Sequence, residues 1–313
     1  MKLITPVNIT KSHFKLNQQN SITLIGSCFS QNIGNKLTYH KFNINPNFFG
    51  TVFNPISICN NLSLLISKQL YTEQDFYNFD NKKLVNFNNQ FVSYNKNVDK
   101  IINEQNIELE KEINHFNESK TLIITFGTAW VYEFEQTGEI VANCHKIPQN
   151  NFTKRLLKVN EIVDAYSSLL KQLTHLNIIF TVSPVRHSKD GLHENNLSKA
   201  TLHLAINKLT EQFKNCNYFP AYELVIDELR DYRFFKDDLV HPSEMAVNYV
   251  WEKFGEAYFS EETLQLNEQI DKVQKALNHK PFNVESDEYS KFKTNLNEQL
   301  NKLKKEYPFI VFD

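Results

Sequence analysis

The sequence predicts an α/β fold in which a mostly parallel β-sheet is covered by helices on both faces. Short apolar runs typical of buried strands occur at residues 22–25, 121–126 and 177–182, and a glycine or a proline follows each of them closely. Amphipathic stretches long enough to be helices separate these runs, which is the alternation that produces parallel sheets. Glycine is scarce, with 7 in the chain, so a glycine that ends a strand marks a place where the backbone requires it.

Length and composition are those of a globular protein. The chain has 313 residues, of which 41% are hydrophobic and 22% charged, enough to bury a sizeable core. A formal net charge of -2 gives no general attraction to nucleic acid or to an anionic membrane, so neither is an expected partner. The four cysteines have no paired spacing, which argues against a zinc site and a disulfide scaffold. The N-terminus lacks the apolar core of a signal peptide, and no run of about 18 apolar residues occurs, so we expect a cytoplasmic protein.

The first apolar run leads into the turn that is the main candidate for chemistry. Residues 22–25 predict a strand that ends at Gly26, and residues 31–37 follow with helical spacing. A hydroxyl after that glycine stands at the carboxyl edge of a parallel sheet, where α/β proteins bind ligands, beside N–H groups that hold anions. Ser27 is therefore the candidate nucleophile, with helix capping as the alternative role. We expect the neighbouring Cys28 to point to the opposite side and to pack in the core.

The next segments predict a loop, a helix and short strands. Residues 45–55 form an aromatic loop bracketed by prolines, and Gly50 within it is a candidate oxyanion donor; a glycine needed only for the turn is the alternative. Pro55 suits the first turn of a helix. Residues 71–94 alternate aromatic and polar side chains, as short strands do, and residues 96–116 predict an exposed helix.

The remaining segments complete the alternation of strands and helices. A buried strand at residues 121–127 continues into a hairpin over residues 128–146, which reaches over the same edge of the sheet. We then expect, in order, a helix at residues 160–176, a strand at 177–184, a helix at 197–213 and a short strand at 218–222. The order of these strands within the sheet does not follow from the sequence.

The chain changes character after residue 259. Residues 261–303 are highly charged and poor in glycine, with leucines and isoleucines at helical spacings, which predicts two helices. We therefore divide the chain into a sheet domain of residues 1–259 and a helical extension of residues 260–313. The extension is expected either to pack on the sheet domain or to form a contact between subunits.

An aspartate and a histidine stand three residues apart near the end of the sheet domain. Asp238 and His241 are spaced so that the carboxylate can accept from one ring nitrogen and leave the other facing a nucleophile. Taken alone, this pattern also fits a surface or capping role. Together with the glycine–serine turn it gives a chain order known from few serine hydrolases, with the nucleophile first and the acid and base last.

Four separated blocks carry a resemblance to a known family. They read GSCFS from Gly26, TFGTAW from Thr125, TVSPVRH from Thr181 and DLVHPS from Asp238. In these blocks the chain resembles the GSCFA domain family, a branch of the SGNH (GDSL-like) hydrolase superfamily. The resemblance extends from about residue 22 to about residue 259, and the C-terminal helices match no motif of it.

The resemblance implies a flavodoxin-like, three-layer α/β/α sandwich with a catalytic triad and an oxyanion site. The implied triad is Ser27 as nucleophile, His241 as base and Asp238 as its orienting partner, and the implied oxyanion site is made by Gly50, Gly127 and Thr128. The superfamily usually has an asparagine where this chain has Thr128. A threonine hydroxyl is a weaker, rotatable donor, and the loss of one oxyanion donor costs about 3 kcal/mol.

Further polar residues are expected near the same edge of the sheet. Asn143 and His145 lie on the return strand of the hairpin, and Arg186 with His187 follows the third strand. An arginine–histidine pair there is suited to a substrate carboxylate or to sugar hydroxyls. The alternatives are a salt bridge from Arg186 to a nearby acid and a helix-capping histidine. The histidines lack metal-binding spacings, so neither a metal nor another cofactor is expected.

The sequence thus predicts a hydrolase or acyltransferase that acts on acyl esters. Carbohydrate O-acyl groups are a substrate class suggested by superfamily analogy. Two alternatives from other classes stay open. One is a carbohydrate- or partner-binding protein on the same fold, and the other is a scaffold that forms homo-oligomers through its C-terminal helices.

Overall fold

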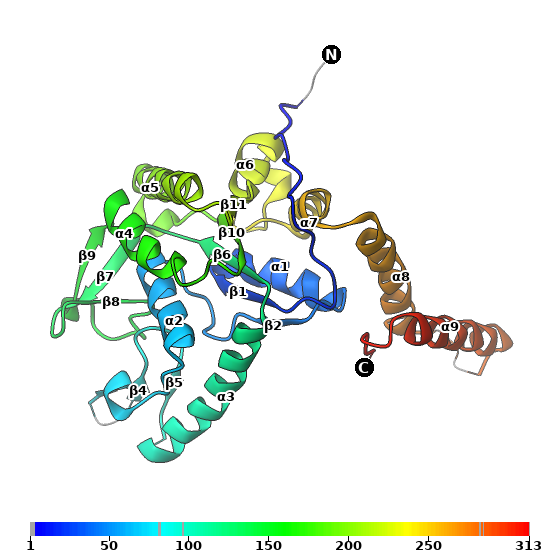
Figure 1. The fold of residues 1–313 in the computed structure, drawn as a ribbon, viewed down its shortest axis with the longest axis horizontal. Coiled ribbons are helices and arrows are strands. Elements are labelled where there is room, and N and C mark those ends of the chain that lie inside the picture. Colours follow the sequence, from blue (N-terminus) through cyan, green and yellow to red (C-terminus); the bar gives the residue numbers. More distant parts are fainter. Residues whose placement is uncertain (1–3, 81–82, 96, 282, 284, 313) are drawn as a thin grey trace.

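A five-stranded parallel sheet forms the centre of the computed structural model, which describes residues 4–80, 83–95, 97–281, 283 and 285–312 (Figure 1). Its strands are β1 (Ile22–Gly26), β2 (Ile44–Pro46), β6 (Thr121–Phe126), β10 (Asn177–Val182) and β11 (Cys216–Tyr218). They lie side by side in the order β2-β1-β6-β10-β11, which is the order of flavodoxin-like sheets. The predicted parallel sheet is confirmed.

Helices cover both faces of this sheet. One face carries α2 (Pro55–Ser67), α3 (Val98–Glu118), α4 (Val159–Leu170) and α5 (Leu192–Gln212), and the other carries α1 (Cys28–Tyr39), α6 (Ala221–Glu223) and α7 (Glu244–Tyr258). Successive strand side chains alternate between the two cores: Leu122 and Ile124 of β6 belong to the first, and Ile123 belongs to the second. The α/β/α sandwich is therefore confirmed, with an apolar layer on each side of the sheet.

Two small antiparallel sheets extend the sandwich. One contains β3 (Tyr77–Phe79), β4 (Lys83–Val85) and β5 (Val92–Ser93), and the other contains β7 (Trp130–Phe134), β8 (Glu139–Val141) and β9 (Phe152–Leu156). The short strands expected at residues 71–94 and the hairpin expected at residues 128–146 are confirmed. Strand β9 was not predicted because its central residues are polar, and β2 was not predicted because it has only three residues.

Several boundaries differ from those expected. Helix α1 begins three residues earlier than predicted, and α5 begins five residues earlier. The strand expected at residues 218–222 ends at Tyr218, and α6 begins at Ala221, directly after a proline that cannot extend a sheet ladder. Residue 96, at the start of a predicted helix, lies outside the described residues, as do residues 1–3 of the N-terminus.

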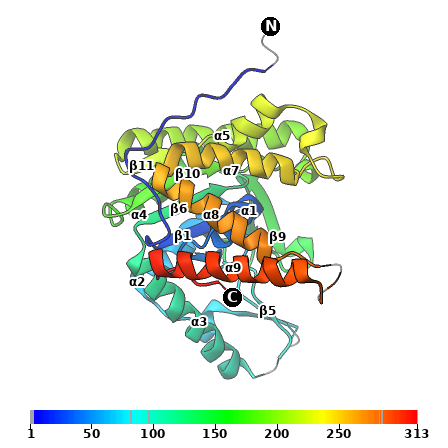
Figure 2. The ribbon, with the colours of Figure 1, turned by 90° about the vertical axis from the view of Figure 1, so that its right-hand side faces the viewer.

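Helices α8 (Glu261–Leu277) and α9 (Asp287–Glu306) lie to one side of the sandwich (Figure 1), and a view from that side shows them in front of it (Figure 2). They share a small apolar cluster of their own, formed by Leu266, Ile270, Val273, Leu303 and Ile310. Helix α8 is also tied to the sheet domain, because Gln18 Nε2 donates to Asn267 Oδ1 at 2.8 Å and Tyr39 donates to Asp271 at 3.1 Å. In the described part of the chain, no helix is both long and apolar enough to span a membrane.

A buried carboxyl group in α3 makes the stability of the fold dependent on pH. Glu112 is 2% exposed and accepts from the side chain of Asn45 in β2, and burial raises its pKa to about 7. The folded state therefore holds a proton that the unfolded chain releases at about pH 4.5. Stability contributed by the protonated carboxyl is lost as the pH rises between these values.

We expect Glu112→Gln to raise the free energy of unfolding by roughly 1–3 kcal/mol at pH 8 and to have little effect near pH 4. Glutamine is neutral at both pH values and still offers an oxygen to Asn45. Urea denaturation at the two pH values measures the difference. Glu110→Gln, at an exposed position of the same helix, is the control. An equal gain for Glu112→Gln at both pH values would contradict a raised pKa.

Candidate functional site

A cavity of about 510 Å³ opens at the carboxyl edge of the central sheet. The start of α1 contributes Cys28, the loops that follow β6 and β10 contribute Thr128 and Arg186, and the loop before α7 contributes His241. Apolar and aromatic walls are added by the neighbouring hairpin and loops, through Phe53, Trp130, Tyr132, Val141 and Ala142. Strands β1 and β6 are the point at which the strand order reverses, which is where open α/β sheets bind ligands.

Asp238 and His241 are in direct hydrogen-bond contact beside this cavity. The Nδ1 atom of His241 lies 2.7 Å from Asp238 Oδ2, while Asp238 Oδ1 accepts the backbone N–H groups of His241 at 2.9 Å and Val240 at 3.0 Å. These backbone hydrogen bonds hold the pKa of the Asp238 carboxyl at about 2. Because Nδ1 is engaged, Nε2 is the ring nitrogen left to exchange a proton.

The loop that carries the pair is closed on itself. Phe235 and Pro242 form an antiparallel bridge, and Lys236 N–H donates to the carbonyl of His241 at 2.8 Å. Leu239 takes a left-handed conformation at φ 58°, which turns the chain between the aspartate and the histidine. Ser243 then caps α7 by accepting from Ala246 N–H. The three-residue spacing read from the sequence thus becomes one tight turn.

The turn between β1 and α1 buries Ser27. Gly26 has φ +143° and lies against the backbone of Thr125 in β6, so the chain leaves the sheet in close contact with its neighbouring strand. Ser27 is the residue before the first turn of α1, yet its side chain makes no capping hydrogen bond. The residue is 1% exposed, its Cβ faces Gly127, and its Oγ is buried without a hydrogen-bond partner among the described residues. Ser27 is not among the described residues that line the cavity.

The prediction that Cys28 packs in the core is wrong. It lines the cavity and is half-buried, whereas the sequence placed it in the core. The prediction followed the alternation of side chains along a strand, which ends at Gly26. Cys28 is already the first residue of α1, where successive side chains are no longer on opposite faces, so the helix turns it toward the open end of the sheet.

The predicted oxyanion donors are engaged within the protein. Gly50 N–H donates to Asn47 O at 2.7 Å in a turn, at φ +70°. Gly127 N–H and Thr128 N–H both donate to the carbonyl of Phe53, at 2.8 and 3.1 Å. Of these three candidates, Thr128 lines the cavity and the two glycines do not. The first turn of α1 is the other source of N–H groups at this edge, because helices leave their first N–H groups without intrahelical partners.

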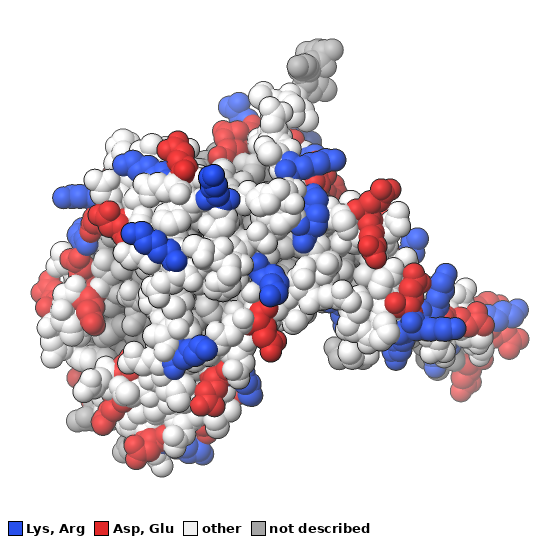
Figure 3. Space-filling model, in the orientation of Figure 1, with Lys and Arg blue, Asp and Glu red and all other residues white. Residues whose placement is uncertain are grey.

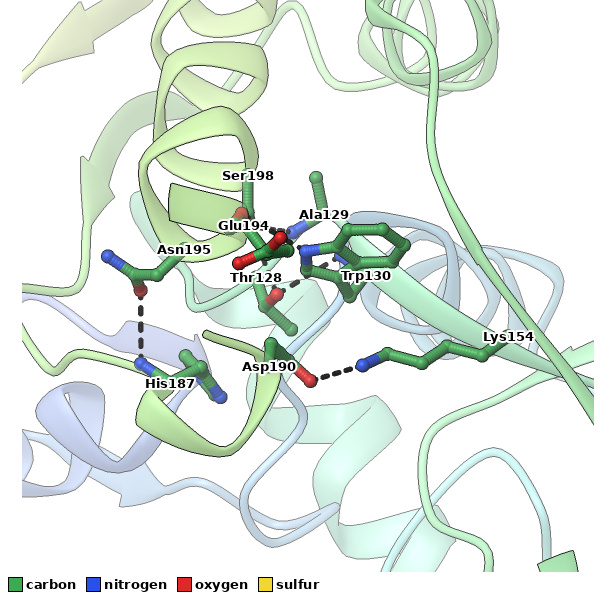
Figure 4. Close-up of polar contacts among 9 residues, drawn as sticks. All are labelled: Thr128, Ala129, Trp130, Lys154, His187, Asp190, Glu194, Asn195 and Ser198. Atoms are coloured by element: carbon green, nitrogen blue, oxygen red, sulfur yellow. Dashed lines mark hydrogen bonds and ion pairs between the residues drawn. The ribbon is translucent and has the colours of Figure 1, made fainter. Parts of the chain in front are cut away.

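Helix α5 supports the loops around the cavity through polar side chains (Figure 4). The Thr128 hydroxyl lies 3.0 Å from the Ser198 hydroxyl and accepts the N–H of Trp130 at 3.1 Å. The indole N–H of Trp130 donates to the carbonyl of Glu194 at 3.1 Å. Asn195 accepts the backbone N–H of His187 at 3.0 Å. Helix α5 thus fixes the loops that follow β6 and β10 relative to one another.

A buried lysine of α5 joins the same two loops. The ammonium of Lys199 donates to Gly127 O at 2.6 Å and to Ser183 O at 2.7 Å, and the residue is 2% exposed. Burial lowers its pKa to about 7, which the nearby Cys28 thiol partly opposes. Sequence reasoning missed this residue. The available signal was that Lys199 lies three residues before the buried Leu202, on the apolar stripe of the helix.

Arg186 and His187 line the cavity, as neighbours of the catalytic candidates. The Arg186 guanidinium lies 5.4 Å from the centre of the Phe235 ring, in the loop that carries His241. His187 packs edge-on against Phe53, and burial lowers its pKa to about 4, so this imidazole is neutral at pH 7. The alternative, a salt bridge from Arg186 to Asp190 or Glu194, is not found among the described residues, and Asp190 pairs with Lys154 instead.

Asn143 and His145 are placed elsewhere. The Asn143 side chain accepts the N–H of His145 at 2.8 Å, and His145 Nε2 lies 2.8 Å from the carbonyl of Asn86. Neither residue is among the described residues that line the cavity. Their polar groups therefore stabilise the loop that follows β8.

The charged side chains and the possible metal ligands of the described residues do not indicate a further function. Basic and acidic side chains are interspersed over the face shown in Figure 3, as expected for a net charge of -2. Among the described residues, no group of three or more histidine, cysteine, aspartate or glutamate side chains is arranged to hold a metal ion.

Comparison with known proteins identifies the family. No curated protein matches the chain. Residues 21–254 match the GSCFA family, and residues 270–313 match the C-terminal domain of GSCFA domain proteins. The first match covers most of the sheet domain and all the residues that line the cavity, and the second covers the end of α8 and all of α9, where no motif was predicted. The chain therefore belongs to the GSCFA family.

Proposed function

We propose that this protein is a hydrolase or acyltransferase that acts on acyl esters in the cavity at the carboxyl edge of the sheet. The observation that carries the proposal is the Asp238–His241 pair, hydrogen-bonded at 2.7 Å with His241 lining the cavity. Such a pair supplies a base that is held in one tautomer, which is what activation of a hydroxyl or thiol nucleophile requires. We further propose that the family belongs to the SGNH hydrolases.

The proposed reaction uses a nucleophile from the β1–α1 turn. His241 Nε2 takes the proton of the nucleophile as it attacks the ester carbonyl, and Asp238 stabilises the imidazolium that forms. His241 then gives the proton to the departing alkoxide, which leaves as an alcohol. Water or another acceptor, deprotonated by His241 in turn, releases the acyl group. We propose the N–H groups at the start of α1 as the donors to the negative charge that develops on the carbonyl oxygen.

The lining of the cavity suits an acyl group joined to a polar body. Trp130 and Tyr132 offer apolar surface, while Arg186 offers a cation for a carboxylate or for sugar hydroxyls. This combination supports acyl esters of polar alcohols, including O-acyl groups on carbohydrates, as the substrate class.

We expect His241→Ala to lower the turnover of activated esters such as p-nitrophenyl acetate at least about 100-fold, because the general base is lost. Asp238→Asn is expected to lower the turnover about tenfold or more, because a neutral asparagine does not stabilise the positive charge of the His241 imidazolium. Steady-state rates on a panel of simple esters and acetylated sugars measure both effects. His193→Ala, an exposed histidine of α5, is the matched control and should keep the wild-type rate. Wild-type protein without turnover of any ester, or His241→Ala with an unchanged rate, would contradict the proposal.

One observation favours a second candidate function, which is ligand binding without turnover. The backbone N–H groups of Gly50, Gly127 and Thr128 all donate to carbonyls of the protein, so none of these three N–H groups is free to hold an oxyanion. A binding protein would hold an acylated sugar in the cavity and leave it intact. Calorimetric titration with acetylated monosaccharides, followed by analysis of the ligand, separates binding from hydrolysis. Arg186→Ala is then expected to weaken the binding.

A further inference from the structure

The two side chains of the β1–α1 turn occupy different environments. The Cβ atom of Ser27 faces Gly127, and its Oγ atom is buried without a hydrogen-bond partner among the described residues. The adjacent Cys28 lines the cavity, and His241 lines the same cavity. A nucleophile has to meet both its base and its substrate, and in this turn Cys28 is the residue with access to the cavity.

Three features of the protein favour the thiolate form of Cys28. Cys28 is the first residue of α1, and the backbone N–H groups of Cys28 and Phe29 act to lower the pKa of its thiol. The buried ammonium of Lys199 lies close enough to favour the thiolate, and Lys236 acts in the same direction. N–H groups at a helix N-terminus and a nearby cation are the features that mark reactive cysteines in proteins.

Burial acts against these groups. It raises the pKa of the Cys28 thiol overall, so the resting sulfur is protonated at neutral pH. A base must therefore take the proton when the sulfur attacks. His241 lines the same cavity and has Nδ1 held by Asp238, so its Nε2 is available for this proton.

We propose that Cys28, rather than Ser27, is the nucleophile of this site, in a triad with His241 and Asp238. The inference rests on the proposed function and names the group that performs its first step. The sulfur attacks the ester carbonyl, the thiol proton passes to His241, and collapse of the tetrahedral intermediate breaks the bond to the alkoxide, which leaves with that proton as an alcohol. The acyl group is then held as a thioester on Cys28. Water attacks the thioester, His241 takes a proton from the water, and the carboxylic acid leaves as the proton returns to sulfur.

The test identifies the acylated atom directly. The full-length protein is mixed with p-nitrophenyl acetate and quenched in acid, and the peptides are mapped by mass spectrometry. We expect one acetyl group on Cys28, released by neutral hydroxylamine, which cleaves thioesters much faster than oxygen esters. The adduct should remain on Cys28 in Ser27→Ala and in Cys144→Ala, and it should be absent from Cys28→Ala and Cys28→Ser.

Alkylation tests the same residue without an ester. Cys144 is a half-buried cysteine next to the hairpin and outside the described lining of the cavity, which makes it the internal reference. We expect iodoacetamide to modify Cys28 about tenfold faster than Cys144 at pH 7.5, and His241→Ala to slow only the reaction of Cys28. Burial raises the pKa of the Cys144 thiol to about 11, and no base is paired with it in the described structure.

The outcomes separate this inference from the proposed function. An acetyl group on Ser27, stable to neutral hydroxylamine, would overturn the role of Cys28 and leave ester hydrolysis standing. Equal alkylation of Cys28 and Cys144, unaffected by His241→Ala, would also overturn it. Rapid, His241-dependent alkylation of Cys28 without turnover of any ester would support the activated thiol and contradict the ester substrate.

Discussion

Gly26→Ala is expected to remove most of the stability of the protein. An alanine Cβ at this position would lie 2.2 Å from the carbonyl oxygen of Thr125 and 2.8 Å from its nitrogen, both of them backbone atoms that cannot rotate away. The backbone also has φ +143°, which side-chain-bearing residues rarely adopt. Strands β1 and β6 would have to separate at the edge that carries the cavity. We expect a loss of about 4 kcal/mol or more, out of the roughly 5–15 kcal/mol typical of a folded domain.

Urea denaturation followed by circular dichroism measures this loss, and Gly138→Ala is the matched control. Gly138 also has a positive φ, at +72°, but an added Cβ there meets no atom within 4 Å. Its cost is therefore limited to backbone strain, about 1 kcal/mol. Losses of similar size in the two variants would mean that contact with Thr125 is not what requires glycine at position 26.

The sheet was predictable because its signals are local and redundant. Residues 121–126 are mainly apolar and are followed by Gly127. In a chain where such runs alternate with helices, this pattern predicts a strand that is buried on both faces of a parallel sheet. Strand β2 has three residues and sits in a segment dominated by prolines and aromatics. It forms because β1 offers an open edge to Ile44, which is a tertiary effect that no local pattern records.

The site was predictable in part. The Asp238–His241 contact depends on a three-residue spacing, so the sequence alone indicates it. The orientation of Ser27 and Cys28 depends on the residue at which the helix begins, and a shift of that start changes which side chain faces the cavity. Helix boundaries inferred from spacing are uncertain by about two to four residues, because the first turn carries no apolar periodicity, and α1 begins three residues earlier than predicted. The proposed nucleophile, Cys28, therefore lies one residue away from Ser27, the nucleophile that the sequence predicts.

The polar residues of α5 that support the site were not predicted, for a different reason. Asn195, Ser198 and Lys199 lie at helical spacing on the buried stripe of α5, ahead of Leu202. A search for apolar residues passes over them, since polar residues on a helix are usually exposed. Buried polar side chains are retained when they satisfy backbone groups, and here they bind the loops after β6 and β10. A polar continuation of an apolar stripe near a strand end is thus a usable signal for residues that position a site.

Lys199→Met is expected to destabilise the protein increasingly as the pH rises. Burial lowers the pKa of Lys199 to about 7 in the folded state, against an ordinary value of 10.5. The unfolded chain therefore holds more protons than the folded state between these two pKa values. As the pH rises between them, the contribution of Lys199 to the free energy of unfolding of the wild type increases. Methionine has a similar length but leaves the carbonyls of Gly127 and Ser183 without their donor, at about 1–3 kcal/mol each. We expect the deficit of the variant to grow by roughly 2 kcal/mol between pH 7 and pH 9.

The same variant should act on Cys28 with the opposite dependence on pH. The charge on Lys199 favours the Cys28 thiolate, and that charge is present mainly below pH 7. Alkylation of Cys28 should therefore be slowed about threefold or more in Lys199→Met at pH 6, and little at pH 9. Lys208→Met, an exposed lysine of the same helix, is the control for both measurements. A stability deficit independent of pH, with alkylation unchanged at pH 6, would mean that Lys199 only fills space. The two opposite trends together would show that one buried amine both binds the loops that follow β6 and β10 and favours the thiolate form of Cys28.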